Sequence, residues 1–387
     1  MKILTWNAWL VSLAFVILLA GCQNQSEKIA PNPIKPEAIS KDEIALQVVD
    51  LLKQTTSRSE VIHSLKAQMP SVALATILDK VNGRGIKNAA TQNLRRIVQK
   101  SEATYKNVDA PKNVEIPELW LHQPQSSLDF SKLLVAYAPD SKDEADWKKV
   151  KAYTLDKKVV YLDPFKAPNV PVVVVETDGF EALKVEADLM NRELQKSGVQ
   201  RLISHQPNGK AKRTAGGLET TKLDRIRLNN DEEPWISGAA EIYAITSGVR
   251  GSNNEAQIQV IPMYYLDYDG TTYYPNQILL FWDDYSYQAA NIQLFEKDDN
   301  YNYKEMVGII VDGVFKITGT LTGEPIVGVL GQIANAVIQA MPDQWFTNDD
   351  DYVDSYYTIE KNKTYRNHNG ARGNANVDLT PYLLLSN

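Results

Sequence analysis

The sequence predicts a multi-domain α+β chain: an N-terminal helical region, a middle α+β region and a C-terminal antiparallel β-sandwich. Two patterns support this prediction. Apolar residues recur at helical spacing up to about residue 105, whereas beyond residue 235 short apolar runs alternate with turns rich in Gly, Asn and Asp. The length of 387 residues also exceeds what one hydrophobic core usually organises.

The domain boundaries are placed where these patterns change. The segment after residue 22 is assigned as a tether because it holds several prolines and few large apolar residues. We expect a signal peptide at 1–21, a lipidated tether at 22–39, a helical domain at 40–110, an α+β domain at 111–204, a linker at 205–234 and an acidic β-sandwich domain at 235–387 with an inserted helix at 326–341.

The N-terminus carries an apolar run that ends in Leu19-Ala20-Gly21-Cys22. The run is short for a membrane span and precedes a small-residue site, which is typical of a secretory signal. The tetrapeptide resembles the lipobox of bacterial lipoproteins. That resemblance implies acylation of Cys22, with palmitate among the acyl groups, and attachment to the membrane through the lipid. Gln23 follows this cysteine, and the absence of Asp at that position resembles the pattern of lipoproteins that are sorted to the outer membrane. The resemblance implies that the protein is held at the outer membrane and faces either the periplasm or the cell surface. An ordinary cleaved signal is the alternative.

Four helices are expected in the N-terminal region. Ser40 and Ser57 each open a Ser-x-x-Glu capping-box pattern ahead of an apolar stripe, so each is expected to begin a helix. A third helix is expected after Pro70, ending near Gly83, and a fourth around Leu94. Cys22 is the only cysteine in the chain, which excludes intramolecular disulfides and cysteine-based zinc sites.

The middle region combines strands with one helix. Apolar runs predict strands at 133–137, 159–162 and 170–175, and apolar residues at helical spacing predict a helix over 180–194. Residues 205–222 are basic and contain several glycines, so we expect a flexible loop there.

Charge is distributed unevenly along the chain. Residues 231–360 contain 21 acidic and 4 basic residues, although the net charge of the whole chain is only −7. Such an acidic segment is unsuited to the phosphate backbone of nucleic acid, so nucleic acid is not an expected partner. It favours cations.

The acidic residues gather in loops after predicted strands. Glu296 and Asp298 are expected on one face of the sheet, just beyond a strand at 292–295, where mutual repulsion favours either solvation or a shared hard cation. We expect Ca²⁺ as a cofactor. The candidate ligands are Asp267, Asp269, Glu296, Asp298, Asp299, Glu305, Asp349, Asp351 and Asp354. Solvated acidic turns are the alternative.

Two resemblances concern this half of the chain. The run from Glu296 to Gly308 resembles the third calcium loop of C2 domains, with Glu at two positions where that family has Asp and one extra residue, and it implies a C2-like sandwich. The runs at 233–244 and 345–354 resemble a family of uncharacterised bacterial secreted lipoproteins. The second resemblance implies no activity.

Three functional hypotheses follow. The first is an envelope-anchored, calcium-binding lipoprotein that binds a protein or glycan ligand without catalysis. The alternative is a secreted hydrolase in which a pair of carboxylates, from residues such as Glu241, Asp269 or Glu296, acts on a glycoside. The third is a membrane-damaging protein that uses the helix at 326–341.

Overall fold

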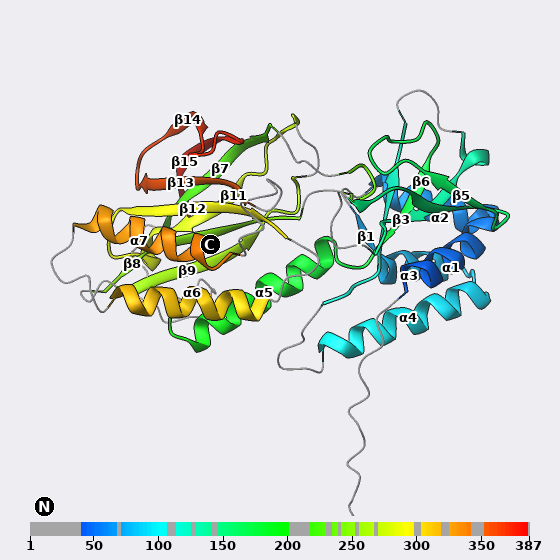
Figure 1. Ribbon diagram of the computed structural model, residues 1–387, viewed down its shortest axis with the longest axis horizontal. Coiled ribbons are helices and arrows are strands. Elements are labelled where there is room, and N and C mark those ends of the chain that lie inside the picture. Colours follow the sequence, from blue (N-terminus) through cyan, green and yellow to red (C-terminus); the bar gives the residue numbers. More distant parts are fainter. Residues whose placement is uncertain are drawn as a thin grey trace, which may run out of the picture. The chain divides into compact units, whose positions relative to one another are not determined.

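The computed structural model describes a chain that is α+β (Figure 1). Its described part contains seven α-helices and three sheets of predominantly antiparallel strands. The described residues are 40–67, 71–106, 114–124, 129–140, 146–200, 217–229, 234–238, 241–251, 255–266, 270–297, 303–318, 325–341 and 352–385.

Four helices come first, as the sequence predicts. They are α1 (Lys41–Lys53), α2 (Thr55–Ala67), α3 (Leu74–Gly83) and α4 (Ala89–Lys106). Ser40 caps α1 as expected, because its hydroxyl accepts a hydrogen bond from the Glu43 N–H at 3.2 Å. Ser57, in contrast, does not begin α2. That helix starts two residues earlier, and Ser57 is buried inside it.

Sheet A follows these helices and shares a hydrophobic core with them. Its strand order is β1-β2-β6-β3-β4-β5, in which β3 and β6 are parallel and all other neighbours are antiparallel. The helices cover one face, where alternate residues such as Leu119, Val135 and Val173 are buried. The other face packs against Trp147 and Ile236. The strands are β1 (Val72–Ala73), β2 (Glu118–His122), β3 (Leu134–Tyr137), β4 (Val150–Thr154), β5 (Val159–Leu162) and β6 (Val172–Glu176).

Sheets B and C pack face to face around a second core. Apolar residues from both sheets, such as Leu223 and Ile226 on sheet B and Ile292 and Leu294 on sheet C, form one buried cluster. Sheet B contains β7 (Leu218–Leu228), β10 (Thr272–Tyr273), β11 (Gln277–Phe281), β14 (Tyr365–Asn369) and β15 (Ala375–Leu384). Sheet C contains β8 (Ile242–Arg250), β9 (Glu255–Pro262), β12 (Ala289–Glu296) and β13 (Tyr352–Glu360).

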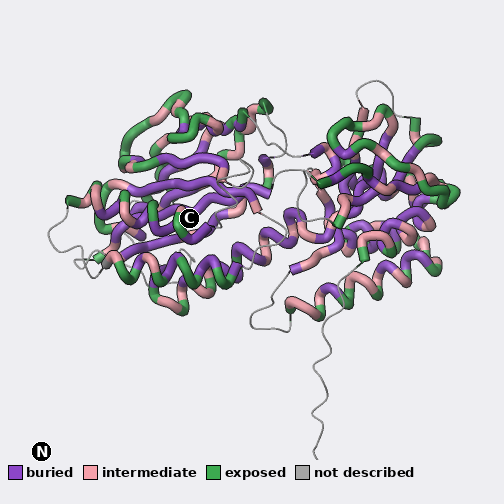
Figure 2. The backbone as a smooth tube through the Cα atoms, in the orientation of Figure 1, coloured by how far each residue is buried: buried purple, intermediate pink, exposed green. Residues whose placement is uncertain are grey.

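Sheet C is buried on both faces (Figure 2). Its second face packs against α5 (Phe180–Lys196), α6 (Tyr303–Thr318) and α7 (Ile326–Gln339). Helices α5 and α7 lie where the sequence predicts them. Among the described residues, no helix is long and apolar enough to cross a membrane.

Two segments differ from the expectation. The sequence interpretation places Glu305 in a calcium loop, whereas the structure places it in the first turn of α6, because Met306, Val307 and Ile310 recur at helical spacing and pack on sheet C. The expected linker at 205–234 contains β7, an 11-residue strand that pairs with β10, β11 and β15. Two short 3₁₀ helices, Phe130–Lys132 and Trp282–Asp284, complete the described elements.

Candidate functional site

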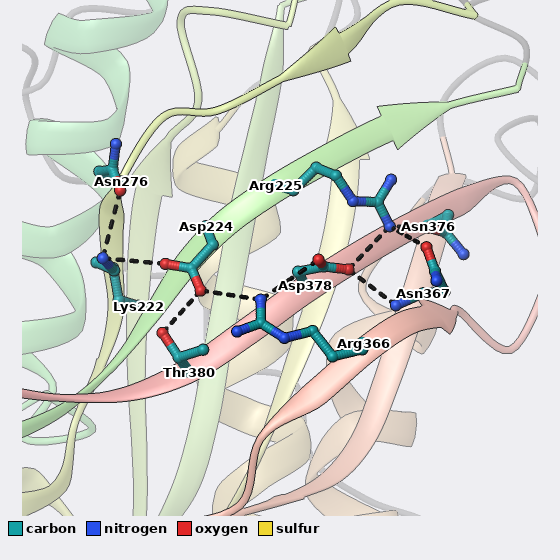
Figure 3. Close-up of polar contacts among 9 residues, drawn as sticks. All are labelled: Lys222, Asp224, Arg225, Asn276, Arg366, Asn367, Asn376, Asp378 and Thr380. Atoms are coloured by element: carbon teal, nitrogen blue, oxygen red, sulfur yellow. Dashed lines mark hydrogen bonds and ion pairs between the residues drawn. The ribbon is translucent and has the colours of Figure 1, made fainter.

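The outer face of sheet B carries a connected set of polar side chains from strands distant in sequence (Figure 3). We call this set the polar row. Its members are Lys222, Asp224, Arg225, Asn276, Arg366, Asn367, Asn376, Asp378 and Thr380. They lie on β7, β14 and β15, except for Asn276, which directly precedes β11.

A β-bulge in β7 places two neighbouring charged residues on this face. Asp378 of β15 is opposite Arg225, but the next residue, Leu379, is opposite Leu223, which leaves Asp224 as an extra residue. A bulge breaks the alternation of side chains between the two faces. Asp224 and Arg225 can therefore both take part in the polar row while Leu223 and Ile226 remain in the core.

A second bulge lies in β14, on the other side of Asp378. Tyr365 pairs with Leu379 and His368 with Val377, so Arg366 and Asn367 together face the single residue Asp378. Asn367 has a φ of 48°, in the left-handed region that asparagine tolerates better than most residues. Asp378 thus lies between two irregular strands.

Asp378 and Arg225 form the centre of the polar row. Oδ1 of Asp378 accepts from the Arg225 Nη2 at 2.9 Å and from the Asn367 N–H at 2.8 Å, and its Oδ2 lies 3.4 Å from the Arg366 Nη1. The same Arg225 nitrogen donates to the Oδ1 of Asn367 at 2.9 Å and of Asn376 at 2.5 Å. The hydrogen bond from Arg225 is the main influence that lowers the pKa of Asp378, so this carboxylate is ionised at neutral pH.

Asp224 organises the other half of the polar row. Its carboxylate lies 3.0 Å from the Lys222 Nζ and 3.4 Å from the Arg366 Nη1, and it accepts a 2.8 Å hydrogen bond from the Thr380 hydroxyl. Arg366 therefore bridges Asp224 and Asp378, although its side chain is 56% exposed. At this end Lys222 lies 5.1 Å from the centre of the Tyr382 ring, which is 44% exposed.

This arrangement suits a ligand that bears many hydroxyl groups. Carboxylates, guanidinium groups and amides alternate along the row, and each is held in place by its neighbours, so little side-chain entropy remains to be lost on binding. The exposed parts of Arg366 and Tyr382 can contact a ligand from solvent. A hard cation is less well suited here, because the two carboxylates already pair with Lys222, Arg225 and Arg366.

Three of the predicted calcium ligands lie among the described residues. Glu296 is buried at the end of β12, Glu305 is exposed on α6, and Asp354 is fully buried on β13. In the part of the chain that the structure describes, no group of three or more His, Cys, Asp or Glu side chains could hold a metal ion. The other six candidates, Asp267, Asp269, Asp298, Asp299, Asp349 and Asp351, lie outside the described residues.

The carboxylate of Asp354 is surrounded by backbone donors. Its Oδ1 accepts from the N–H groups of Ser355 and Arg372, both at 2.8 Å, and its Oδ2 accepts from the Ala375 N–H at 2.7 Å. A Cβ atom on Gly370 would lie 2.1 Å from the Asp354 Cγ, so only glycine fits there. Asp354 thereby fixes the turn between β14 and β15, the two strands that carry five of the nine residues of the polar row.

The sequence interpretation missed the polar row because of the two bulges. In β7 the apolar residues Leu218, Leu223, Ile226 and Leu228 do not follow a period of two, and the stretch resembles a loop. The available signal was the density of charged residues between Lys222 and Arg227, combined with β-branched and leucine residues.

Comparison with known protein families gives one match. Residues 41–387 match the family described as "Protein of unknown function (DUF3103)". No curated protein and no solved structure matches the chain. The matched region begins at the first residue of α1 and includes every helix and strand described above.

Proposed function

Because the chain belongs to DUF3103, a family described only as proteins of unknown function, we propose a function from the geometry of the polar row. The protein is a non-catalytic binding protein of the cell envelope, and the polar row of sheet B binds a glycan. Lipid attachment at Cys22 holds it at the outer membrane.

The single observation that supports glycan binding is the pre-arranged series of donors and acceptors centred on Asp378 (Figure 3). Sugar hydroxyl groups both donate and accept hydrogen bonds, so neighbouring carboxylate and guanidinium groups can bind the same sugar ring. Tyr382 lies at one end of the row and offers an exposed ring for the apolar face of a sugar.

Calcium binding and a C2-like sandwich remain part of this proposal. Calcium would bind among the acidic residues around Asp298 and Asp299 and around Asp349 and Asp351, which lie outside the described residues. The packing of sheets B and C around one core supports a sandwich.

The hydrolase alternative has less support. Glu241 and Glu296 come from neighbouring strands, since Ile242 pairs with Glu296. Alternation along β8 and β12, however, directs Glu296 toward the core shared with sheet B and Glu241 toward the helices, so the two carboxylates are on opposite faces of sheet C. They are therefore not placed to act as a pair on one glycosidic bond.

A glycan array of bacterial polysaccharides and lipopolysaccharide chains tests the proposal. We expect the wild-type chain to bind a subset of these glycans. Arg366→Ala and Tyr382→Ala should each reduce that binding at least tenfold, because the Arg366 side chain is exposed in the polar row and the Tyr382 ring is exposed at its end. The matched control is Arg96→Ala, which removes another exposed arginine on α4. The proposal is refuted if the wild-type chain binds no glycan on the array, or if all variants bind as well as the wild type.

A further inference from the structure

Arg227 lies beside the polar row on the outer face of sheet B. Ile226 and Leu228 of β7 are buried in the core between sheets B and C, so the alternate residues Arg225 and Arg227 face outward. Arg227 is exposed, and its register partner on β15 is Asn376 of the polar row. Among the described residues it forms no ion pair. The outer face therefore carries a basic group in addition to those of the polar row.

The two carboxylates of the polar row already have basic partners. Asp224 lies 3.0 Å from the Lys222 Nζ, and Asp378 lies 2.9 Å from the Arg225 Nη2. Arg366 is a third basic group, 3.4 Å from both carboxylates. With the adjacent arginine of β7, the outer face presents four basic groups against two acidic ones. The excess of positive charge favours an anionic ligand.

One edge of the Arg366 guanidinium group has no partner among the described residues. Its Nη1 alone contacts the two carboxylates, and no hydrogen bond involves its Nε or Nη2. These two nitrogens direct N–H groups from the same edge of the guanidinium plane, which matches two oxygens of a carboxylate or a phosphate. The side chain is 56% exposed, so a ligand can reach this edge from solvent.

Arg227 offers the other edge of its guanidinium group. Its Nε donates to the Gly270 carbonyl at 3.0 Å, whereas Nη1 and Nη2 form no hydrogen bond with the described residues. The bond to Gly270 holds the side chain in place, so less side-chain entropy is lost when a ligand binds. Each exposed arginine thus has a pair of N–H groups available for one anionic group.

We propose that the glycan bound by the polar row is acidic, and that Arg366 and Arg227 each bind one of its carboxylate or phosphate groups. This inference rests on the function proposed above, and it adds the chemical class of the glycan. The polar row accounts for the recognition of hydroxyl groups, and the two exposed arginines account for the recognition of charge.

Local charge outweighs the net charge of the chain at this face. The whole chain carries a net charge of −7, which alone would repel an acidic glycan. At physiological ionic strength, however, exposed charges more than about 8 Å apart are largely screened from each other. The acidic segment 231–360 does not include β7, β14 or β15, the strands that carry these arginines and their partners. The basic groups on these strands therefore determine which ligand charge is favoured.

The size of the face favours an oligosaccharide over a single sugar. Arg227 and Arg366 come from β7 and β14, the two neighbours of β15, and strands separated in this way are about 10 Å apart. Tyr382 lies six residues along β15 from Asn376, the register partner of Arg227, which corresponds to about 20 Å. Contacts over this length require several linked sugars, and acidic groups on different sugars can each bind one arginine.

Removal of the anionic groups from the bound glycans tests the inference. Each glycan of the array that the full wild-type chain binds is compared with the same glycan after reduction of its carboxylates to hydroxyl groups, and after enzymatic removal of its phosphate monoesters. We expect the bound glycans to be acidic, and one of the two treatments to weaken binding at least tenfold. The treatment that does so distinguishes a carboxylate from a phosphate.

Glutamine substitutions assign the effect to the two arginines. Arg227→Gln and Arg366→Gln remove the charge and keep a hydrogen-bonding side chain, so each should lower the ratio of affinities for the acidic and the treated glycan at least threefold. Arg227 forms no ion pair with the described residues, so its substitution leaves the polar row intact. The matched control is Arg96→Gln on α4, which should keep the wild-type ratio.

The outcomes separate this inference from the proposed function. If the wild-type chain binds no glycan on the array, both fail. If the bound glycans are neutral, or if neither treatment weakens binding, only the inference is overturned and glycan binding stands. The inference is also overturned if both glutamine variants keep the wild-type ratio of affinities.

Discussion

The turn between β14 and β15 should depend on Asp354 for its stability. Asp354→Ala removes the acceptor from three backbone N–H groups, of which those of Ser355 and Ala375 are buried and that of Arg372 is partly exposed. An unsatisfied buried donor costs about 2 kcal/mol, so the two buried donors predict a loss of about 4 kcal/mol in the free energy of unfolding. Asp354→Asn keeps one oxygen but turns an amide toward one or more N–H groups, and we expect a loss of about 2 kcal/mol.

A double-mutant cycle makes this prediction specific. Gly370→Ala should destabilise the wild type, because the new Cβ would lie 2.1 Å from the Asp354 Cγ. In the Asp354→Ala background the carboxylate is gone and the same change should cost much less. Urea denaturation followed by far-ultraviolet circular dichroism measures all four unfolding free energies.

The same measurements distinguish a structural carboxylate from a calcium ligand. The losses should be equal in EDTA and in millimolar Ca²⁺ if backbone donors alone hold Asp354. If Asp354→Asn is as stable as the wild type, or if Gly370→Ala costs the same in both backgrounds, the reasoning is refuted.

Three further predictions concern other buried or acidic groups. Burial raises the pKa of Glu118 to about 7, so the folded state still binds a proton at a pH where the unfolded state, with a pKa near 4.5, has released it. The free energy of unfolding should therefore fall as the pH rises from about 4.5 to 7. Urea denaturation at pH 5 and at pH 8 should show a smaller fall for Glu118→Gln than for the wild type. Tyr356 is buried beside a void of about 10 Å³, and its hydroxyl has no hydrogen-bond partner among the described residues. Tyr356→Phe should therefore leave the melting temperature unchanged or raise it. A fall of several degrees would contradict this prediction. Calcium binding predicts a higher melting temperature in millimolar Ca²⁺ than in EDTA, and equal values would exclude a stabilising calcium site.

Local signals in the sequence predicted the positions of most elements. Ser40 identified the start of α1, the apolar run at 159–162 matched β5, and the apolar residues from Phe180 gave α5. These features depend on periodicity and capping, which neighbouring residues determine. Ser57 failed as a start signal because α2 begins only two residues after α1 ends, before the capping-box pattern is reached.

The polar row could not be predicted in the same way. It depends on the register of β7, β14 and β15, and bulges at Asp224 and at Arg366 and Asn367 set that register. Helix α6 was overlooked for a different reason. Its apolar spacing was visible in the sequence, but the acidic residues before it favoured a loop.

The pairing of β7 with β15 has a consequence for folding during synthesis. The Thr220 hydroxyl donates to the Tyr382 carbonyl across 162 residues of chain, and β15 lies between β7 and β14. A nascent chain therefore cannot complete sheet B until β15 has left the ribosome, because the loop must close before the strand pairs form. Until then sheet B lacks the strand that joins β7 to β14 and stays incomplete.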